Sequence, residues 1–387
     1  MSATNNPPTI LLIRNAASGD FGGAETYQIS IASVLRESGY NPIIVTRSRK
    51  LLAYAATHSI STITGWWWSR QDWNGYRIIF TPVYIIWQVI LTAWYIWLIK
   101  SSKASALHIQ SKDDFIAATI AGRMMRKKVV WTDHMDLRYI LQNITKPLRN
   151  PVGKLVYWAA HLANHLILIS KNEHKLVTAH FKAQDDLKDK IVIIHNGVID
   201  QQDKYDISHN STPDFSFCIA SRIVVNKGVG EAIEAYIKFK EDTPIRRPTT
   251  LNIYGDGPDM QKFQLLAKKH EDIIFHGHQT NAIDKIAQSD VFILPSYQEG
   301  FSIALLEATM LGKVIIASDV DSNGEIIHDN KTGLLIPMKN IAALAAALQK
   351  VYADEKLCKK LEKNARDNYL TSYNLHKIVT EQITPLY

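Results

Sequence analysis

Short apolar runs alternate with longer amphipathic stretches along almost the whole chain. In the first part, apolar runs at residues 9–13 and 41–45 flank a stretch, about 24–38, in which the pattern is helical. Short apolar runs are typical of strands that are buried on both faces, and the longer stretches are typical of helices that cover a sheet. The pattern predicts an α/β fold built from parallel sheets with helices on both faces.

The alternation is interrupted by a polar stretch that is poor in core-forming side chains, and a second series of apolar runs follows it. Since 387 residues exceed what a single core usually holds, we expect two domains joined at this stretch. Both are expected to be Rossmann-like βαβ domains that face each other across a cleft at the carboxyl ends of their strands. The expected boundaries are a first domain over 1–198, a linker over 199–213, a second domain over 214–373 and a final segment, 374–387, that returns to the first domain.

The region between residues 66 and 100 departs from the alternation because it is mostly apolar and aromatic. Seven of the nine Trp residues lie between Trp66 and Trp97, and residues 78–99 contain no charged side chain. These 22 residues are enough to span a bilayer, but Pro82 and the surrounding βα pattern argue against a span. Three interpretations stay open: a buried core helix, a helix whose outer face rests in a membrane interface, and a span.

Charge is divided unevenly between the two halves. Residues 1–190 hold 23 Lys and Arg against 12 Asp and Glu, a net charge of +11, whereas residues 191–387 have a net charge of −4. A basic half indicates an anionic partner. The basic residues are scattered and match no nucleic-acid-binding module, so we do not expect nucleic acid. We expect instead an anionic membrane surface that meets residues 66–100.

The cellular location follows from two further features. Two cysteines, Cys218 and Cys358, are too few for a disulfide framework and indicate a reducing compartment. Residues 1–8 are polar and lead directly into the first predicted strand, so no signal peptide is expected. We therefore expect a cytoplasmic protein that is bound peripherally at the inner face of the cytoplasmic membrane.

The segment from Glu299 to Glu307 carries the strongest candidate chemistry. It follows the apolar run 291–294, and Gly300 allows a sharp turn before a helical pattern begins at Phe301. Eight residues at ~100° each end about 80° beyond two full turns, so both carboxylates are expected near one side of the helix N-terminus. This end of a helix offers unpaired N–H groups and a positive dipole, which suit an anion such as phosphate.

Other candidate residues also follow predicted strands. Gly22-Gly23 lies between the first strand and the first helix, where backbone N–H groups can meet a phosphate. His134 follows the predicted strand at 128–132, and Arg222 and Lys227 follow the first strand of the second domain. Arg suits bidentate phosphate binding and Lys acts as a point charge. Each residue alone has a structural or solvated alternative, but their common position at strand ends favours one ligand cleft.

Together these motifs resemble those of the retaining glycosyltransferases of family 4, the glycosyl transferase group 1 type, which have the GT-B fold. The specific part of the resemblance lies in the second half, in Ala220-Ser-Arg222 with Lys227-Gly228, Tyr254-Gly-Asp-Gly-Pro258, Glu299 with Glu307, Gly312-Lys-Val-Ile-Ile-Ala317, 325–327 and 332–335. The first half matches more loosely, through 22–25, His134, Ser170 and 196–198. Residues 321–325, Asp-Ser-Asn-Gly-Glu, depart from the family pattern because they replace the double-glycine run that is usual there.

The resemblance implies a nucleoside diphosphate sugar as the donor, linked to UDP or GDP, and it implies neither a cofactor nor a metal. The residues expected to take part in catalysis are Arg222 and Lys227 on the diphosphate, Glu299 on the sugar and His134 on the sugar from the first domain. The remaining donor contacts are expected from Glu307 to the ribose and from Gly22, Gly23, Gly300, Phe301, Ser302 and Ile303. We also expect Glu25 near the acceptor, and Tyr254 and Gln279 near the nucleobase.

The expected function is retaining transfer of a sugar to a lipid-linked or membrane-bound glycan, as in the synthesis of surface polysaccharide, lipopolysaccharide or glycolipid. Two alternatives remain. A nucleotide-sugar epimerase of GT-B build would act without an acceptor, and a non-catalytic membrane-associated binding protein would keep the fold alone. The presence of Arg222, Lys227, Glu299 and Glu307 together favours the transferase.

Overall fold

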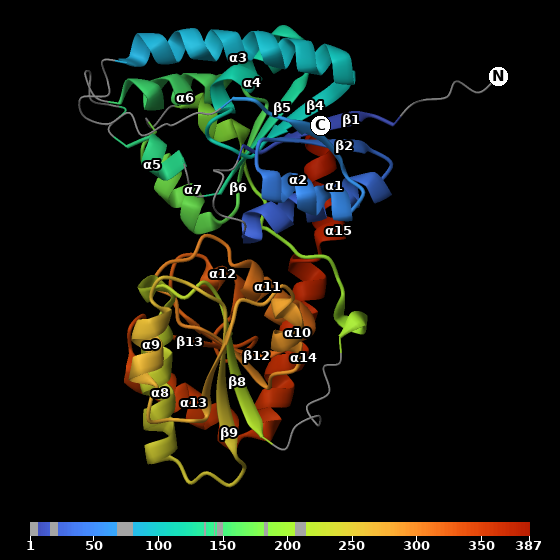
Figure 1. Ribbon diagram of the computed structural model, residues 1–387. Helices are drawn as coiled ribbons and strands as arrows, with labels where there is room; N and C mark the ends of the chain where they lie inside the picture. The colour runs from blue at the N-terminus through green and yellow to red at the C-terminus, as the bar shows by residue number, and fades with distance from the viewer. Residues whose placement is uncertain are drawn as a thin grey trace, which may run out of the picture. The chain divides into compact units, whose positions relative to one another are not determined.

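The computed structural model describes residues 7–15, 22–67, 80–134, 137–142, 144, 150–181, 185–205 and 214–387. The chain divides into two compact units (Figure 1): unit 1 comprises residues 1–196 and 375–387, and unit 2 comprises residues 197–374. Residues 206–213 of the expected linker and 68–79 of the Trp-rich region lie outside the described residues.

Unit 1 contains a seven-stranded parallel sheet in the order β3-β2-β1-β4-β5-β6-β7. All residues of β1 are buried, as expected for a strand covered on both faces. The strands are β1 (Thr9–Ile13), β2 (Asn41–Thr46), β3 (Ser61–Thr64), β4 (Ala104–Ile109), β5 (Lys128–Asp133), β6 (His165–Leu168) and β7 (Ile191–Ile193).

Helices cover both faces of this sheet. Figure 1 shows α3, α4 and α6 along one face and α1 and α2 along the other. The chain's last residues also belong to unit 1, where the Tyr387 hydroxyl lies 2.6 Å from His108 Nδ1 of β4. The helical elements are α1 (Gly23–Glu37), α2 (Arg49–Thr57), α3 (Thr81–Ser102), α4 (Phe115–Met124), α5 (Leu137–Ile140), α6 (Pro151–Leu162), α7 (Lys171–Thr178), the 3₁₀ helices η2 (Asp186–Lys190) and η6 (Thr384–Leu386), α15 (Leu375–Ile378) and the π-helical turn η5 (Val379–Ile383).

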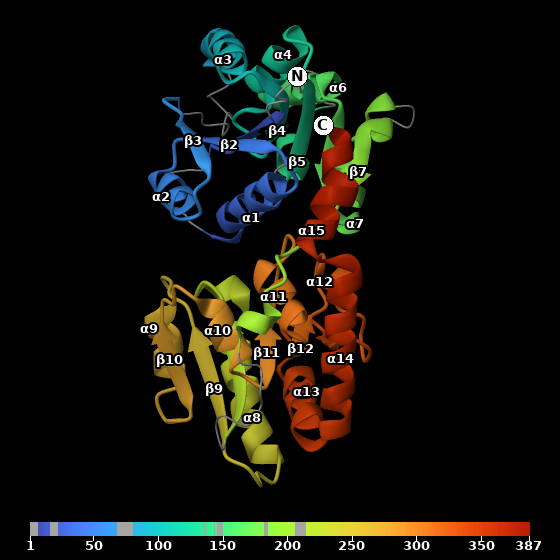
Figure 2. The ribbon, with the colours of Figure 1, turned by 90° about the vertical axis from the view of Figure 1, so that its right-hand side faces the viewer.

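Unit 2 contains a six-stranded parallel sheet in the order β10-β9-β8-β11-β12-β13, with β8 and β11 at its centre (Figure 2). The strands are β8 (Phe215–Ala220), β9 (Thr249–Tyr254), β10 (Ile273–Gly277), β11 (Val291–Leu294), β12 (Val314–Ser318) and β13 (Leu334–Ile336). The helical elements are η3 (Gln202–Lys204), η4 (Val225–Lys227), α8 (Val229–Asp242), α9 (Met260–Leu266), α10 (Ala282–Ala287), α11 (Ile303–Leu311), α12 (Asn323–Ile326), α13 (Ile341–Ala353) and α14 (Glu355–Ser372). The two parallel sheets with their helices confirm the predicted α/β fold class.

The strand orders locate where a ligand is expected in each unit. In unit 1 the strands that follow β1 in sequence are added on one side of it, and from β4 onward they are added on its other side. In unit 2 the same change of direction occurs between β8 and β11. A crevice opens outside the carboxyl ends of two such neighbouring strands because their connecting segments leave in opposite directions. The carboxyl ends of β1 and β4 and those of β8 and β11 are therefore the expected ligand positions.

Helix α3 has one packed face and one exposed apolar face. Tyr84, Leu91, Tyr95 and Leu98 are buried against the core of unit 1, and the helix lies along α4 (Figure 1). Among the described residues, α3 is the one helix that is long and apolar enough to cross a bilayer, a test that the core helix of a soluble protein also passes. Its packed face shows that the helix is at least partly a core element.

A buried carboxylate joins α3 to the rest of unit 1. Asp114, directly before α4, is fully buried and accepts hydrogen bonds from Trp67 Nε1 at 2.7 Å, from the Tyr95 hydroxyl at 2.8 Å and from the Ser111 hydroxyl at 2.8 Å. Burial raises the pKa of this carboxyl to about 6. The three donors come from separate segments, so this residue fixes the segment after β3 against α3 and α4.

Candidate functional site

The turn after β8 brings a cation to the expected ligand position at the carboxyl ends of β8 and β11. Residues 221–228 leave the carboxyl end of β8 and form η4 before α8 begins. Gly228 has φ +70°, and a Cβ there would lie 2.1 Å from the carbonyl oxygen of Pro295, which follows β11. Tyr297 N–H donates to the Asn226 carbonyl at 2.8 Å. Glycine is therefore required for the two turns to pack together, and Lys227 lies at their junction.

Lys227 and Glu299 form an ion pair at this junction. Lys227 Nζ lies 2.6 Å from Glu299 Oε1, and the Glu299 side chain is only 8% exposed. A buried carboxylate is stable when a partner charge is held against it, and a buried pair of this kind is sensitive to the loss of either member. The structure thus brings together two of the four residues that the sequence assigned to catalysis.

The loop that departs from the family pattern supports the same turn. Asp321, with φ +43°, accepts a hydrogen bond from the Glu299 backbone N–H at 3.0 Å through Oδ2. The next residue, Ser322, donates from its hydroxyl to the Gly300 carbonyl. Residues 321–322 therefore hold the backbone on either side of the predicted ligand turn, and in this structure Asp321 contacts protein backbone.

Glu307 lies on α11, eight residues beyond Glu299. Ser302 caps the helix by accepting from the Leu305 N–H at 3.4 Å. The Glu307 side chain is half-buried and has no hydrogen-bond or ion-pair partner in the part of the chain that the structure describes. Burial alone raises the pKa of its carboxyl to about 7. A desolvated carboxyl without a partner is a group prepared to accept hydrogen bonds from a ligand.

The other predicted residues of unit 2 lie on neighbouring turns. Arg222 is exposed in the turn after β8, and Phe301 is buried with its ring 6.0 Å from that of Tyr373, so Phe301 offers only its backbone to a ligand. At the carboxyl end of β9, the Tyr254 ring stacks on His276 with centroids 4.4 Å apart. Gln279 donates from its side chain to the His276 carbonyl at 2.9 Å. Contact of these last residues with a nucleobase stays a prediction.

In unit 1, Glu25 is held in the fold on both of its oxygens. Oε2 accepts from the Gly22 backbone N–H at 3.0 Å, which caps α1, and Oε1 lies 2.8 Å from Arg14 Nη2. Arg14 also donates to the Gln110 carbonyl at 3.1 Å. Glu25 therefore joins the start of α1 to β1 and to the end of β4, and it fixes the Gly22-Gly23 turn. Residues 16–21 of this loop lie outside the described residues.

His134 follows β5 in the same unit. Burial lowers the pKa of its imidazole to about 3, so the ring is neutral at physiological pH. Its Nε2 is enclosed and has no hydrogen-bond partner within the described ranges, while the ring of Tyr27 meets it edge-on with centroids 6.2 Å apart. A neutral histidine with one uncommitted nitrogen is suited to exchange a hydrogen bond with a sugar hydroxyl.

Two residues that sequence reasoning missed follow strands of the same sheet, close to the end of β5. Asn15 follows β1 and Gln110 follows β4; both are buried, and none of their side-chain amide atoms has a partner in the described segments. Strand β4 pairs with both β1 and β5, so the three side chains come from three adjacent strand ends. Buried amides without partners are uncommon, and here they mark a place where a polar ligand is expected. The available signal was a polar residue directly after each apolar strand.

Comparison with known proteins follows the same division of the chain. A family described as "Glycosyltransferase Family 4" matches residues 21–202, and a family described as "Glycosyl transferases group 1" matches residues 200–368. The matches meet at the boundary between the two units and together leave only the ends of the chain uncovered.

Comparisons with individual proteins lead to the same family. The chain is 24% identical over 242 residues to the glycogen synthase of Mycobacterium tuberculosis, covering 61% of this chain but only 57% of that protein. It is 27% identical over 305 residues to the Escherichia coli UDP-Gal:alpha-D-GlcNAc-diphosphoundecaprenol alpha-1,3-galactosyltransferase, covering 75% of this chain and 76% of that protein. The fold is similar to that of the Anabaena protein HepE, solved in complex with UDP and glucose, with a TM-score of 0.73, 17% identity, and coverage of 98% of this chain and 99% of that chain. The chain therefore belongs to the family 4, group 1 glycosyltransferases and has their GT-B fold.

Proposed function

We propose that this transferase moves a sugar from a nucleoside diphosphate sugar, linked to UDP or GDP, to a lipid-linked glycan with retention of the anomeric configuration. The observation that carries the proposal is the Lys227–Glu299 pair at the carboxyl ends of β8 and β11, 2.6 Å apart and beside the N-terminus of α11. A cation, a helix N-terminus and a buried carboxylate on one turn match the two parts of such a donor, an anionic diphosphate and a polyhydroxylated sugar.

A bound donor would replace the contact between Lys227 and Glu299 with contacts of its own to each side chain. A diphosphate with two or more negative charges competes with a single carboxylate for Lys227, and Arg222 in the same turn adds a second cation. Glu299, released from Lys227, then accepts hydrogen bonds from sugar hydroxyls. Glu307, half-buried and without a partner in the described chain, accepts from the ribose hydroxyls. The crystal complex of HepE with UDP and glucose supports a donor of this class.

In the proposed reaction the bond between the anomeric carbon and the diphosphate oxygen breaks, and the acceptor oxygen bonds to the same face of the sugar. The acceptor's proton passes to an oxygen of the departing diphosphate, so no protein base is required. Lys227 and Arg222 stabilise the negative charge that develops on the leaving group, which is usually the largest single contribution in this kind of chemistry. Neutral His134 contacts the sugar. Since two cations supply this charge, catalysis needs no metal.

The exposed face of α3 supports a membrane-bound acceptor. Val83, Ile86, Val89 and Trp97 are each about 60% exposed, at spacings of three, three and eight residues that place them along one side of the helix. Trp87 and Trp94, in contrast, pack against the core. A stripe of large apolar side chains on a soluble surface marks an interaction site.

Basic side chains lie at one end of the stripe. Lys100 and Lys103 at the end of α3 are exposed, and so are Arg123 and Arg126 at the end of α4. Both helices lead into the amino ends of neighbouring parallel strands, β4 and β5, so these four charges lie at the same end of the helix pair. An apolar stripe bordered by cations fits an anionic lipid surface. The protein would then lie peripherally on the inner face of the cytoplasmic membrane, where a diphosphoundecaprenol-linked acceptor, as named for the E. coli relative, is available.

Transfer is tested with radiolabelled UDP- and GDP-sugars and membrane extract as the source of acceptor. We expect label in the lipid fraction from one donor, unchanged by EDTA in the assay, and loss of label with Lys227→Ala. Lys262→Ala, on helix α9 of the same unit, controls for the loss of a lysine. If no donor gives label, or if free nucleotide sugar changes without any acceptor, transfer is not the activity.

Membrane binding is tested separately by sedimentation with vesicles of neutral or anionic lipid. We expect binding to anionic vesicles that weakens at high salt, and that falls when Val83, Ile86 and Val89 are replaced by Ser. Leu265→Ser, an equally exposed apolar residue of unit 2 at 71% exposure, is the matched control. Equal binding by the triple variant and the control would show that α3 does not meet the membrane.

A further inference from the structure

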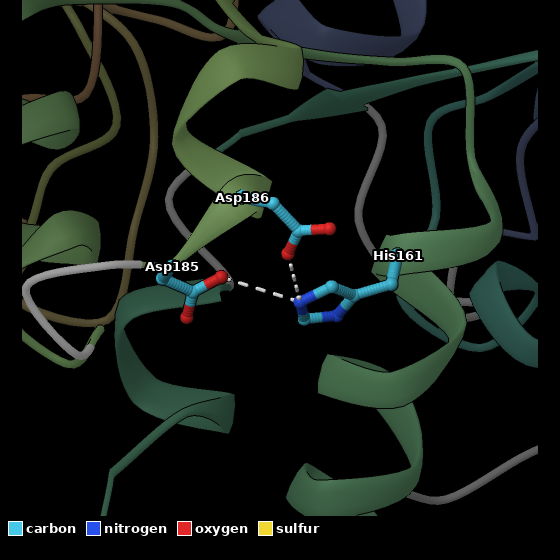
Figure 3. A group of neighbouring side chains, drawn as sticks. All are labelled: His161, Asp185 and Asp186. Carbon is cyan, nitrogen blue, oxygen red and sulfur yellow. Dashed lines mark hydrogen bonds and ion pairs between the residues drawn. The ribbon is translucent and has the colours of Figure 1, made fainter.

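Three side chains near the amino ends of the unit 1 strands form a second cluster (Figure 3). His161 lies in the last turn of α6, Asp185 precedes η2 and Asp186 begins it. His161 Nε2 lies 3.2 Å from Oδ1 of Asp185 and 3.2 Å from Oδ1 of Asp186. The helices α6 and η2 lead into the amino ends of β6 and β7, whereas Asn15, Gln110 and His134 lie at carboxyl ends. The cluster is therefore separate from the proposed ligand site.

The hydrogen bonding of the imidazole requires an additional proton or a metal cation in this cluster. His161 Nδ1 lies 2.9 Å from the Tyr157 carbonyl oxygen. A carbonyl can only accept, so Nδ1 carries the hydrogen. In a neutral ring Nε2 would then direct a lone pair at two carboxylate oxygens, an arrangement that is repulsive. A proton between Nε2 and a carboxylate oxygen, carried by either group, or a metal cation among the three atoms resolves the conflict.

Burial of Asp185 strengthens the case for a cation. Its side chain is 4% exposed and points at His161 in Figure 3. Oδ1 also accepts from the Leu187 N–H at 3.0 Å, but Oδ2 is enclosed and has no hydrogen-bond partner among the described residues. A buried carboxylate with an unsatisfied oxygen is unfavourable unless a positive charge compensates it. Asp186, at 77% exposure, leaves the cluster open to solvent and hence to an entering ion.

We propose that His161, Asp185 and Asp186 bind one Zn²⁺ ion or a similar first-row divalent cation. The three ligand atoms lie within 4.8 Å of one another. Tetrahedral Zn²⁺ with N and O ligands at ~2.0–2.1 Å places neighbouring ligand atoms about 3.3 Å apart, close to both separations from His161 Nε2. An imidazole with carboxylates suits such an ion better than Mg²⁺ or Ca²⁺, which prefer oxygen ligands alone.

The surroundings suit a structural ion that is open to water in its fourth position. The Tyr157 carbonyl fixes the ring so that Nε2 faces the ion, as backbone carbonyls commonly do for metal-binding histidines. The ion would link the end of α6 to the start of η2, which are 24 residues apart in sequence, and so hold the segments that lead into β6 and β7. This role is independent of the proposed transferase chemistry.

The experiment uses untagged full-length protein from which metal has been removed with a chelator. Titration calorimetry with ZnCl₂ is expected to show one tight site. The midpoint of thermal unfolding, Tm, is expected to rise by on the order of 5 °C when the Zn²⁺ concentration is about a hundred times Kd. MgCl₂ should have little effect. Asp186→Asn, which changes an exposed side chain, should weaken Zn²⁺ binding at least about tenfold. Asp189→Asn, exposed on the same short helix, is the matched control.

Two results would overturn the proposal. One is equal Zn²⁺ binding by the wild type, Asp186→Asn and His161→Ala. The other is a wild-type protein whose thermal stability does not respond to Zn²⁺, which would show that no metal ion is held in the cluster. Sugar transfer is measured in the same preparations. If the wild-type protein binds Zn²⁺ but transfers no sugar, the proposed function is contradicted while the proposal of a metal site is still supported.

Discussion

Glu307→Gln gives the sharpest test of the donor site because burial of the carboxyl predicts the sign of its effect and its approximate size. The carboxyl is half-buried on α11, has no partner in the described chain, and has a pKa raised by burial from 4.5 to about 7. Gln keeps the shape of the side chain and its ability to accept a hydrogen bond but cannot ionise. The substitution therefore isolates the effect of burying the charge.

The magnitude follows from the two pKa values. The difference between 4.5 and about 7 corresponds to about 3 kcal/mol of folding free energy. The folded pKa is the higher one, so the folded protein holds the proton more tightly between these pH values. The stabilising effect of this bound proton on the folded state is complete below pH 4.5 and is lost as pH rises through about 7. Relative to wild type, Glu307→Gln should therefore gain up to about 3 kcal/mol of stability between pH 4.5 and pH 8.

The assay is urea unfolding of both proteins at pH 5, 6, 7 and 8. All nine Trp residues precede residue 197, so far-UV circular dichroism is used to follow unit 2. Glu271→Gln, at an exposed position of unit 2, controls for the loss of one negative charge. In parallel, donor affinity of the wild type should rise with pH through about 7, as the carboxylate forms, whereas that of the variant should not. A stability difference that is the same at pH 5 and pH 8 would refute the account of Glu307.

Three further predictions concern separate parts of the molecule. Arg222→Ala should mainly lower kcat in the transfer assay, because a charge on the leaving group develops in the transition state, whereas Glu307→Ala should mainly raise the donor KM; the reverse pattern would show that the two roles are assigned wrongly. Gln110→Leu should raise the KM for the acceptor or the donor in steady-state kinetics. The free energy of unfolding should stay unchanged or rise by about 1 kcal/mol, since the Gln110 amide has no partner in the described residues. A loss of stability would identify the amide as structural. Asp114→Ala leaves the donors of Trp67 and Tyr95 unmatched and should lower stability by about 3 kcal/mol or more, measured by urea unfolding with Trp fluorescence; a change below 1 kcal/mol would contradict the buried network.

The local pattern of the sequence determined the elements of the fold and the type of chemistry. Apolar runs such as Leu11 to Ile13 and Phe292 to Leu294 became buried parallel strands because such residues are stable only where both faces of a strand are covered. The positions of Lys227 and Glu299 after two predicted strands also favoured one ligand cleft, and the two side chains do meet. These inferences succeed because strand burial and turn chemistry depend mainly on neighbouring residues.

Tertiary structure decided which strand ends lie side by side. The order β3-β2-β1-β4 places Asn15 next to Gln110, although 95 positions separate them in the sequence, and no local pattern contains that order. In the same way, packing chose which side of α3 is exposed, because a helix that is apolar all round has no polar face to mark its orientation. Contacts between distant segments depend on the energy of the whole core, so the sequence alone could place candidate residues at strand ends but not determine which strand ends lie side by side.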